Sequence, residues 1–165
     1  MDHSSRRPGD NAIEASVAIH RPVADVFSFY RDFENLPRFL GDVMAIERIG
    51  AATFRWTIEG PLGIRLRSTI KLAEERANEL IRYETTAPPG MRTRWAVHFT
   101  PGPGPGRTEV REVLKTPFGG LGRTALSLVG KPPAEEVAAN LRRLKQVMET
   151  GGVTDTDHAV AGKFG

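Results

Sequence analysis

The stretch from Val43 to Thr116 alternates between apolar and polar residues with a period of two, which is the pattern of half-buried β-strands. It predicts strands at residues 43–50, 52–60, 63–75, 79–87, 91–100 and 107–116, separated by short glycine- and proline-containing turns. Connections this short can join antiparallel neighbours, but parallel strands need a long crossover. The chain is therefore constrained to fold around a six-stranded antiparallel meander.

The residues before the meander predict one more strand and two short helices. Apolar residues alternate with polar ones over residues 12–20, and Pro22 then suits the first turn of a helix. Four residues follow Pro22 at helical spacing: Val23, Val26, Phe27 and Tyr30. A second short helix is expected over residues 35–40, with Asn35 as its N-cap and Gly41 at its end.

The residues after the meander predict a short helical segment at 121–129 and a long helix at 133–149. The long helix carries one apolar stripe: Ala134, Val137, Ala138, Leu141, Leu144, Val147 and Met148. Its length of ~26 Å matches that of an eight-residue strand at ~3.3 Å per residue. It is the only predicted element long enough to cover the apolar face of the sheet. We therefore expect an α+β fold: a seven-stranded antiparallel sheet curved around a long C-terminal helix, with two short helices between strands 1 and 2.

Length and composition restrict the organisation and the chemistry. The chain of 165 residues fits one domain, expected at residues 12–150, with flexible tails at residues 1–11 and 151–165. It has no cysteine, and its four histidines lie far apart in the sequence, so we expect no disulfide, no metal site and no cofactor. The sequence shows no apolar run of ~20 residues and no secretory signal. A cytoplasmic protein without stable membrane insertion is expected.

The charge pattern argues against nucleic acid as a partner. Lys and Arg together number 23 and Asp and Glu 20, for a net charge of +3. The arginines occupy every second position of several strands, which is typical of a solvated sheet face. A nucleic-acid-binding surface would instead concentrate basic residues with aromatic residues among them.

The alternation also predicts which side chains point inward. Phe54, Trp56 and Ile58 share one face of their strand, and the same reasoning gives further inward sets. These are Ile64, Leu66, Ser68, Ile70 and Leu72, then Met91, Thr93, Trp95, Val97 and Phe99. The strand at 79–87 is ambiguous, because Leu80, Arg82 and Glu84 oppose Ile81, Tyr83 and Thr85. We choose the second set.

Glu112 falls on the inward face together with Val110 and Leu114. A carboxylate facing an apolar interior costs free energy unless it is paired or protonated. Two interpretations are open. Glu112 can lie in a ligand cavity, as an orienting group or a general acid/base. Alternatively, it is a strand-end residue that reaches water or a cross-strand partner. The inward hydroxyls of Ser68, Tyr83 and Thr85 are likewise either ligand contacts or groups satisfied within the protein.

Several local strings carry a resemblance to a known family. They are Ile19–Phe27, Phe33–Phe39, Trp56–Gly63, and an ending that runs from Gly119–Gly122 to Asn140–Lys145. With the order of elements they resemble the START-like, or SRPBCC, superfamily, in particular its bacterial polyketide cyclase/dehydrase-like, coenzyme-Q-binding-protein-like branch. The resemblance covers residues 12–150. It implies a helix-grip fold with a cavity for a hydrophobic small molecule between sheet and C-terminal helix.

Three functions are compatible with these observations. The first is binding of a lipid, quinone or polyketide-like molecule, the second a polyketide cyclase/dehydrase-type enzyme, and the third an interaction module whose interior is filled by its own side chains. The scarcity of inward acid/base groups favours binding, so we assign no catalytic residue and leave the oligomeric state open. The expected ligand-binding residues are Phe27, Tyr30, Trp56, Ser68, Tyr83, Thr85, Trp95, Glu112 and Leu141.

Overall fold

The computed structural model describes residues 12–87, 93–115 and 133–164. The N-terminal half contains β1 (Ala12–Ile19), α1 (Val23–Arg31), the 3₁₀ helix η1 (Phe33–Arg38), β2 (Val43–Arg48), β3 (Thr53–Glu59) and η2 (Pro61–Gly63). The remaining elements are β4 (Arg65–Arg76), β5 (Leu80–Ala87), β6 (Arg94–Pro101), β7 (Thr108–Lys115) and α3 (Pro133–Thr150). The helical segment expected at 121–129 lies outside the described residues.

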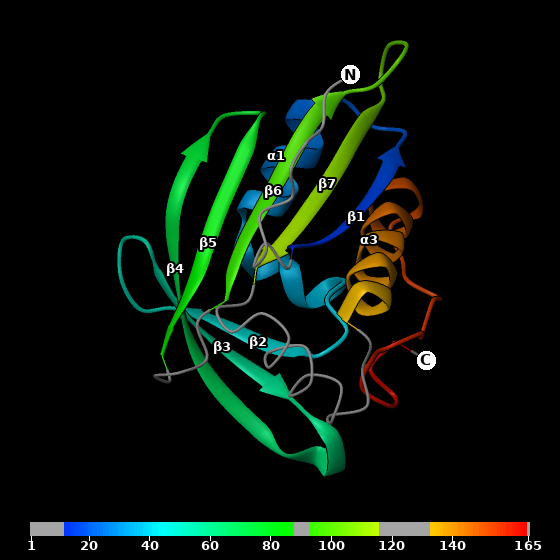
Figure 1. Cartoon of the computed structure of the whole chain (residues 1–165). Coiled ribbons are helices and arrows are strands. Elements are labelled where there is room, and N and C mark those ends of the chain that lie inside the picture. Colours follow the sequence, from blue (N-terminus) through cyan, green and yellow to red (C-terminus); the bar gives the residue numbers. More distant parts are fainter. Residues whose placement is uncertain (1–11, 88–92, 116–132, 165) are drawn as a thin grey trace, which may run out of the picture.

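The strands form one antiparallel sheet in the order β1-β7-β6-β5-β4-β3-β2 (Figure 1). Strands β2 to β7 follow one another as a meander, as their short connections predict. The first strand, β1, forms one edge of the sheet and pairs with the last strand, β7. The pairing of β4 with β5 shifts register twice, between Thr69 and Ile70 and between Leu72 and Glu74. Such irregularities bend a strand and strengthen its twist.

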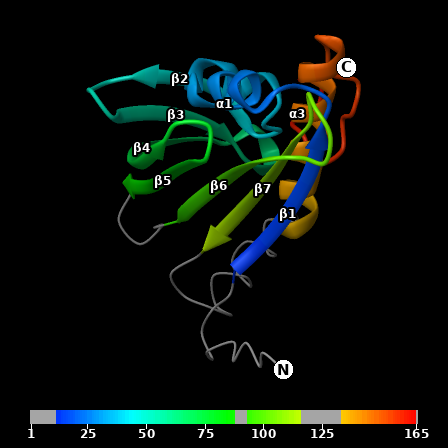
Figure 2. The same ribbon diagram turned by 90° about the horizontal axis from the view of Figure 1, so that it is seen from above.

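Helices α1 and α3 lie on the concave side of the curved sheet (Figure 2). Leu141, Leu144 and Val147 of α3 belong to the same buried cluster as Ile19 of β1, and Val137 packs with Ile13 and Leu114. The expected C-terminal helix packed against the sheet is thus confirmed, and it lies along β1 (Figure 1). The seven-stranded antiparallel sheet and the two short helices between its first two strands are confirmed as well.

The second short helix begins earlier than the sequence predicted. Asp32, not Asn35, is its N-cap, and its carboxylate accepts a hydrogen bond from the Glu34 backbone N–H at 3.2 Å. Phe33 and Leu36 are buried three residues apart, the spacing of one 3₁₀ turn. Asn35 instead donates from its side chain to the Phe29 carbonyl.

Residues 151–164 lie against the domain, which differs from the flexible tail expected for 151–165. The Val160 N–H donates to the Gly41 carbonyl at 2.9 Å, and the Gly41 N–H donates to Asn140 Oδ1 of α3 at 2.9 Å. The approach is so close that a β-carbon at Gly41 would lie 2.5 Å from the His158 carbonyl oxygen. The polar, glycine-rich composition of this segment has no hydrophobic periodicity, and for that reason the sequence predicted a flexible tail. In the structure, backbone hydrogen bonds attach the segment to the domain.

Candidate functional site

Glu112 lies in the middle of β7 with its side chain in the interior. Its neighbours across the sheet are Ala15 of β1 and Val97 of β6, neither of which offers a polar side chain. Glu112 is 1% exposed, and among the described residues its Oε2 has no hydrogen-bond partner. Burial raises the pKa of this carboxyl group from 4.5 to about 8. The inward position expected from the sequence is confirmed, and at neutral pH the group is mainly a neutral acid that can donate a hydrogen bond.

Two tyrosine hydroxyls meet in the same interior. Tyr30 of α1 and Tyr83 of β5 are buried, and their hydroxyl oxygens are hydrogen-bonded at 3.1 Å. Burial raises the pKa of both phenols well above the ordinary value of 10.0, and the charge of a nearby ionised Glu112 raises them further. Both hydroxyls are therefore protonated at any physiological pH. Together with Glu112 they form a group of neutral, exchangeable donors and acceptors.

Trp56 of β3 supplies a second polar atom without a partner. Its ring is buried between Phe33, at 6.0 Å, and Tyr83, at 5.7 Å between ring centroids. Its Nε1–H has no hydrogen-bond partner among the described residues. Buried polar groups are nearly always hydrogen-bonded. A polar group of a bound molecule, or a water molecule, would supply the hydrogen bonds that Trp56 Nε1 and Glu112 Oε2 lack.

The hydroxyls nearer the ends of β5 and β6 are satisfied within the protein. Thr85 and Thr93 hydrogen-bond through their Oγ1 atoms at 2.7 Å, and the Trp95 indole N–H donates to Thr93 Oγ1 at 3.1 Å. Trp95 is half-buried and stacks on Tyr83 at 5.8 Å with an interplanar angle of 10°. The Thr85 hydroxyl is therefore hydrogen-bonded within the protein, to Thr93, which was not among the expected ligand-binding residues.

The other expected ligand residues also face the interior. Phe27 packs edge-on against Phe99 at 5.3 Å, Leu141 belongs to the main buried cluster, and Ser68 is buried opposite Trp56. The choice of Ile81, Tyr83 and Thr85 as the inward set of β5 is confirmed, since all three are buried.

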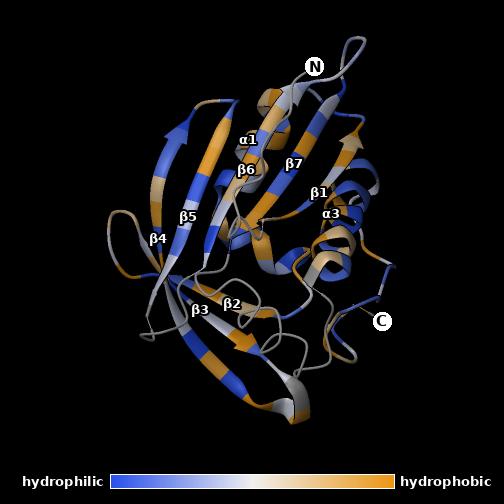
Figure 3. Ribbon diagram, viewed as in Figure 1, coloured by the Kyte–Doolittle hydropathy of each residue, from blue (hydrophilic) through white to orange (hydrophobic). Residues whose placement is uncertain are grey.

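Two predicted inward residues point into solvent instead. Ile64 is 66% exposed and Leu66 is 37% exposed. The alternation of the sequence is correct, but the β3–β4 hairpin extends away from α1, and neither α1 nor α3 covers this end of its apolar face (Figures 1 and 3).

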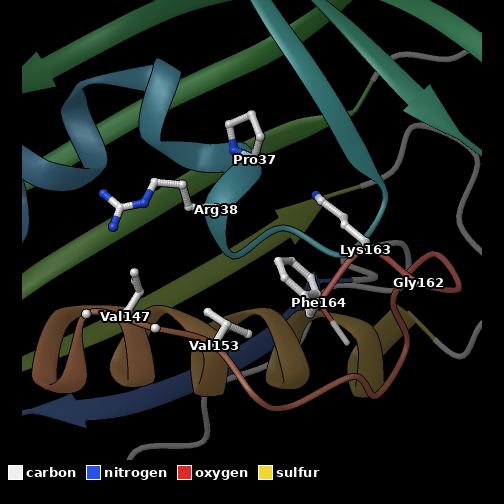
Figure 4. A pocket seen from close by; sticks show the side chains of 9 residues that line it. Pro37, Arg38, Val147, Val153, Gly162, Lys163 and Phe164 are labelled. Atoms are coloured by element: carbon white, nitrogen blue, oxygen red, sulfur yellow. The ribbon is translucent and has the colours of Figure 1, made fainter.

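An open pocket of about 570 Å³ lies between η1, the end of α3 and the C-terminal segment (Figure 4). It is lined by Pro37, Arg38, Val147, Gly151, Gly152, Val153, Gly162, Lys163 and Phe164. None of the nine expected ligand-binding residues lines it. A ligand cavity beside Glu112 therefore stays a prediction, and the observation behind it is the unpartnered Glu112 Oε2.

The described part of the chain offers little for metal chemistry. Within residues 12–87, 93–115 and 133–164, no three His, Asp or Glu side chains are grouped to hold a metal ion.

Among the helices of those same ranges, none has the length and apolar character needed to cross a bilayer.

A seven-stranded antiparallel sheet curved around a C-terminal helix, with two short helices after the first strand, defines the helix-grip, START-like class of proteins. The chain belongs to the family described as polyketide cyclase / dehydrase and lipid transport, whose model matches residues 11–149. A search of curated protein sequences finds no match.

Solved structures show the same fold at low sequence identity. The protein DR_A0006 of Deinococcus radiodurans is 23% identical over 85% of this chain and 98% of its own, with a TM-score of 0.66. A START superfamily protein of Mycobacterium smegmatis is 12% identical over 81% of this chain and 98% of its own, with a TM-score of 0.60. The di-domain ARO/CYC BexL of the BE-7585A biosynthetic pathway is 15% identical over 87% of this chain and 52% of its own, with a TM-score of 0.63.

Proposed function

We propose that this protein binds a hydrophobic small molecule that carries at least one carbonyl or hydroxyl group, between the concave face of the sheet and α3. Lipids, quinones and polyketide-like compounds have this chemistry. The observation that carries the proposal is the pair of unpartnered buried polar atoms, Glu112 Oε2 and Trp56 Nε1, among apolar and aromatic side chains. Apolar walls with a few converging polar groups are what small-molecule sites require.

The protonation state of Glu112 fits such a ligand. With a pKa of about 8, the neutral acid can donate to a carbonyl oxygen or accept from a hydroxyl without placing a charge in the interior. The Trp56 N–H adds a second donor, and the Tyr30–Tyr83 pair can reorient its hydroxyl hydrogens toward either type of group. Family membership supports the same reading, because the family description includes lipid transport.

A competition assay with a polarity-sensitive dye tests binding. The dye should become fluorescent with the protein and be displaced by long-chain lipids or quinones. Trp95→Ala should change the affinity for the dye, whereas Arg94→Ala, an exposed neighbour on the same strand, should leave it unchanged. Mass spectrometry of an organic extract of the natively purified protein would then identify the bound class. A protein that binds neither dye nor extractable ligand would contradict the proposal and favour an interaction module with a filled interior.

An enzyme of the polyketide cyclase/dehydrase type is the second candidate. It is favoured by the pKa of Glu112, since a general acid or base works best when its pKa lies near the working pH. The fold similarity to the ARO/CYC protein BexL adds support. Glu112→Gln separates the candidates, because a binding protein should retain most of its ligand affinity whereas an enzyme should bind and lose turnover.

A further inference from the structure

The turn between β3 and β4 presents apolar side chains to solvent. Leu62 is 98% exposed, and Ile64 and Leu66 next to it are also exposed. We call residues 61–67 the β3–β4 tip. It lies at the lower end of the molecule in Figure 1, and apolar segments mark this end of the hairpin in Figure 3. A large apolar side chain at such an apex gains nothing from the folded domain itself.

The backbone at Leu62 makes this choice of residue more unusual. Leu62 has φ 61° and ψ 22°, the left-handed region that disfavours residues with a β-carbon. Glycine would adopt it without strain, and the next residue, Gly63, does so at φ 71°. The Gly60 N–H donates to the Ile64 carbonyl at 2.7 Å and closes the turn. The leucine therefore has a strained backbone, and its side chain gains no burial from folding that would offset the strain.

Cationic side chains alternate with the apolar ones along the tip. Arg65 and Arg67 are exposed and occupy the positions between Ile64, Leu66 and Ser68. Arg65 forms an ion pair with Glu59 at 3.4 Å. Arg67 has no ion pair with any of the described residues. The tip thus combines an apolar apex with at least one cation that its own surroundings do not neutralise.

We propose that the β3–β4 tip docks the protein onto the surface of anionic phospholipid bilayers. The apolar apex would enter the boundary between headgroups and acyl chains, while Arg67 meets the lipid phosphates. The convex tip is small, and three apolar side chains do not provide the ~800 Å² per partner of a stable protein interface. A bilayer needs no such flat, complementary area.

Docking at the tip is independent of the ligand proposed above. A protein that binds a lipid or quinone would gain access to the membrane pool of that ligand, but the tip could serve an interaction module equally well. The two proposals can fail separately, because vesicle binding needs no occupied interior and dye binding needs no vesicle.

Site-specific fluorescence tests the insertion of the tip. The chain has no cysteine, so Leu62→Cys gives one labelling site for an environment-sensitive fluorophore. Ile49→Cys is the matched control, since Ile49 is another exposed apolar residue (42%) and lies beyond the opposite end of β3. Vesicles of phosphatidylcholine with phosphatidylserine should shift the emission of the label at 62 to shorter wavelength and leave that at 49 unchanged. Equal shifts, or none, would overturn the proposal.

Vesicle flotation measures the contributions of the side chains without a label. Leu62→Ser should lower partitioning roughly tenfold, and Arg67→Gln should lower it about fivefold on phosphatidylserine vesicles. High salt should abolish the difference that Arg67→Gln makes. Unchanged melting temperatures would show that the variants fold. Wild-type partitioning by Leu62→Ser would refute the proposal, and so would self-association that this variant abolishes, because the occupant would then be a second copy of the chain.

Discussion

The hydroxyl oxygens of Tyr30 and Tyr83 lie 3.1 Å apart, and this hydrogen bond joins α1 to β5 in the interior. It holds two neutral donors beside Glu112, whose charge influences both phenols. Neither tyrosine can supply a positive charge, and burial is the cause of the raised pKa of Glu112. The interior therefore favours the protonated carboxyl group, and this has consequences for stability.

The raised pKa of Glu112 predicts that stability falls as the pH rises from 4.5 to about 8. Below this range the carboxyl group is protonated in both the folded and the unfolded state. Within it the unfolded chain loses the proton that the folded protein keeps, so unfolding becomes easier by up to roughly 1.4 kcal/mol per pH unit. Glu112→Gln should remove this dependence, and its advantage over the wild type should grow with pH and level off above about pH 8.

Urea denaturation over this pH range measures the effect, with Glu109→Gln as the control. Glu109 lies on the same strand and is exposed. If the difference in unfolding free energy between the wild type and Glu112→Gln were constant with pH, the carboxyl group would have the same pKa in both states, and the buried acid would be refuted.

Removing one hydroxyl of the tyrosine pair should destabilise the protein. Tyr83→Phe leaves the buried Tyr30 hydroxyl without the partner it has at 3.1 Å, which costs about 1–3 kcal/mol. The double variant Tyr30→Phe/Tyr83→Phe leaves neither hydroxyl orphaned, so its loss should be smaller than the sum of the single losses. Chemical denaturation of all four proteins measures this coupling. Additive losses would show that the two hydroxyls do not interact.

Period-two alternation predicted the sheet well because every connection in the meander is too short for another topology. It also predicted the inward position of Glu112, since Val110 and Leu114 fix the parity of β7. The same rule failed for Ile64 and Leu66. Alternation shows which side chains of a strand lie on the same face of the sheet. It does not show how far along the strand other elements pack against that face.

Contacts that depend on the backbone could not be predicted from composition. The C-terminal segment is held in part by main-chain groups, such as the Val160 N–H on the Gly41 carbonyl, and composition does not show where a backbone N–H finds its acceptor. The unpartnered Trp56 Nε1 could not be predicted either. The alternation places the indole ring in the interior, but it does not show whether an acceptor lies near the ring N–H.

Arg143 should be essential for the packing of the C-terminal segment. It is fully buried, donates to the Phe39 carbonyl at 2.7 Å and to Asn140 Oδ1 at 2.6 Å, and also donates to the Asp157 carbonyl. Arg143→Met would orphan the Phe39 and Asp157 carbonyls, at about 1–3 kcal/mol for each one left buried, whereas Asn140 Oδ1 would keep the Gly41 N–H. The protein should melt at lower temperature and lose amide-exchange protection in the C-terminal segment.

The neighbouring arginine provides the control. Arg142 is half exposed and forms an ion pair with Asp155 at 3.0 Å. Arg142→Met should therefore cost no more than about 1 kcal/mol, as is usual for exposed pairs. Equal losses for the two variants would mean that burial of Arg143 contributes nothing to the attachment.

Leu141→Asp tests whether α3 forms one side of the hydrophobic core. Leu141 is buried in the same cluster as Ile19 of β1, so an aspartate there would place an unpaired charge beneath the sheet. Such a charge destabilises proteins by several kcal/mol, and for a domain of this size each kcal/mol lowers the melting temperature by roughly 2–4 °C. Ala134→Asp adds the same side chain to the exposed first turn of α3, where a negative charge favours the helix. It should melt close to the wild type. If Leu141→Asp also melted within a degree or two of the wild type, α3 would not cover the sheet, and the interior proposed for the ligand would be open to solvent.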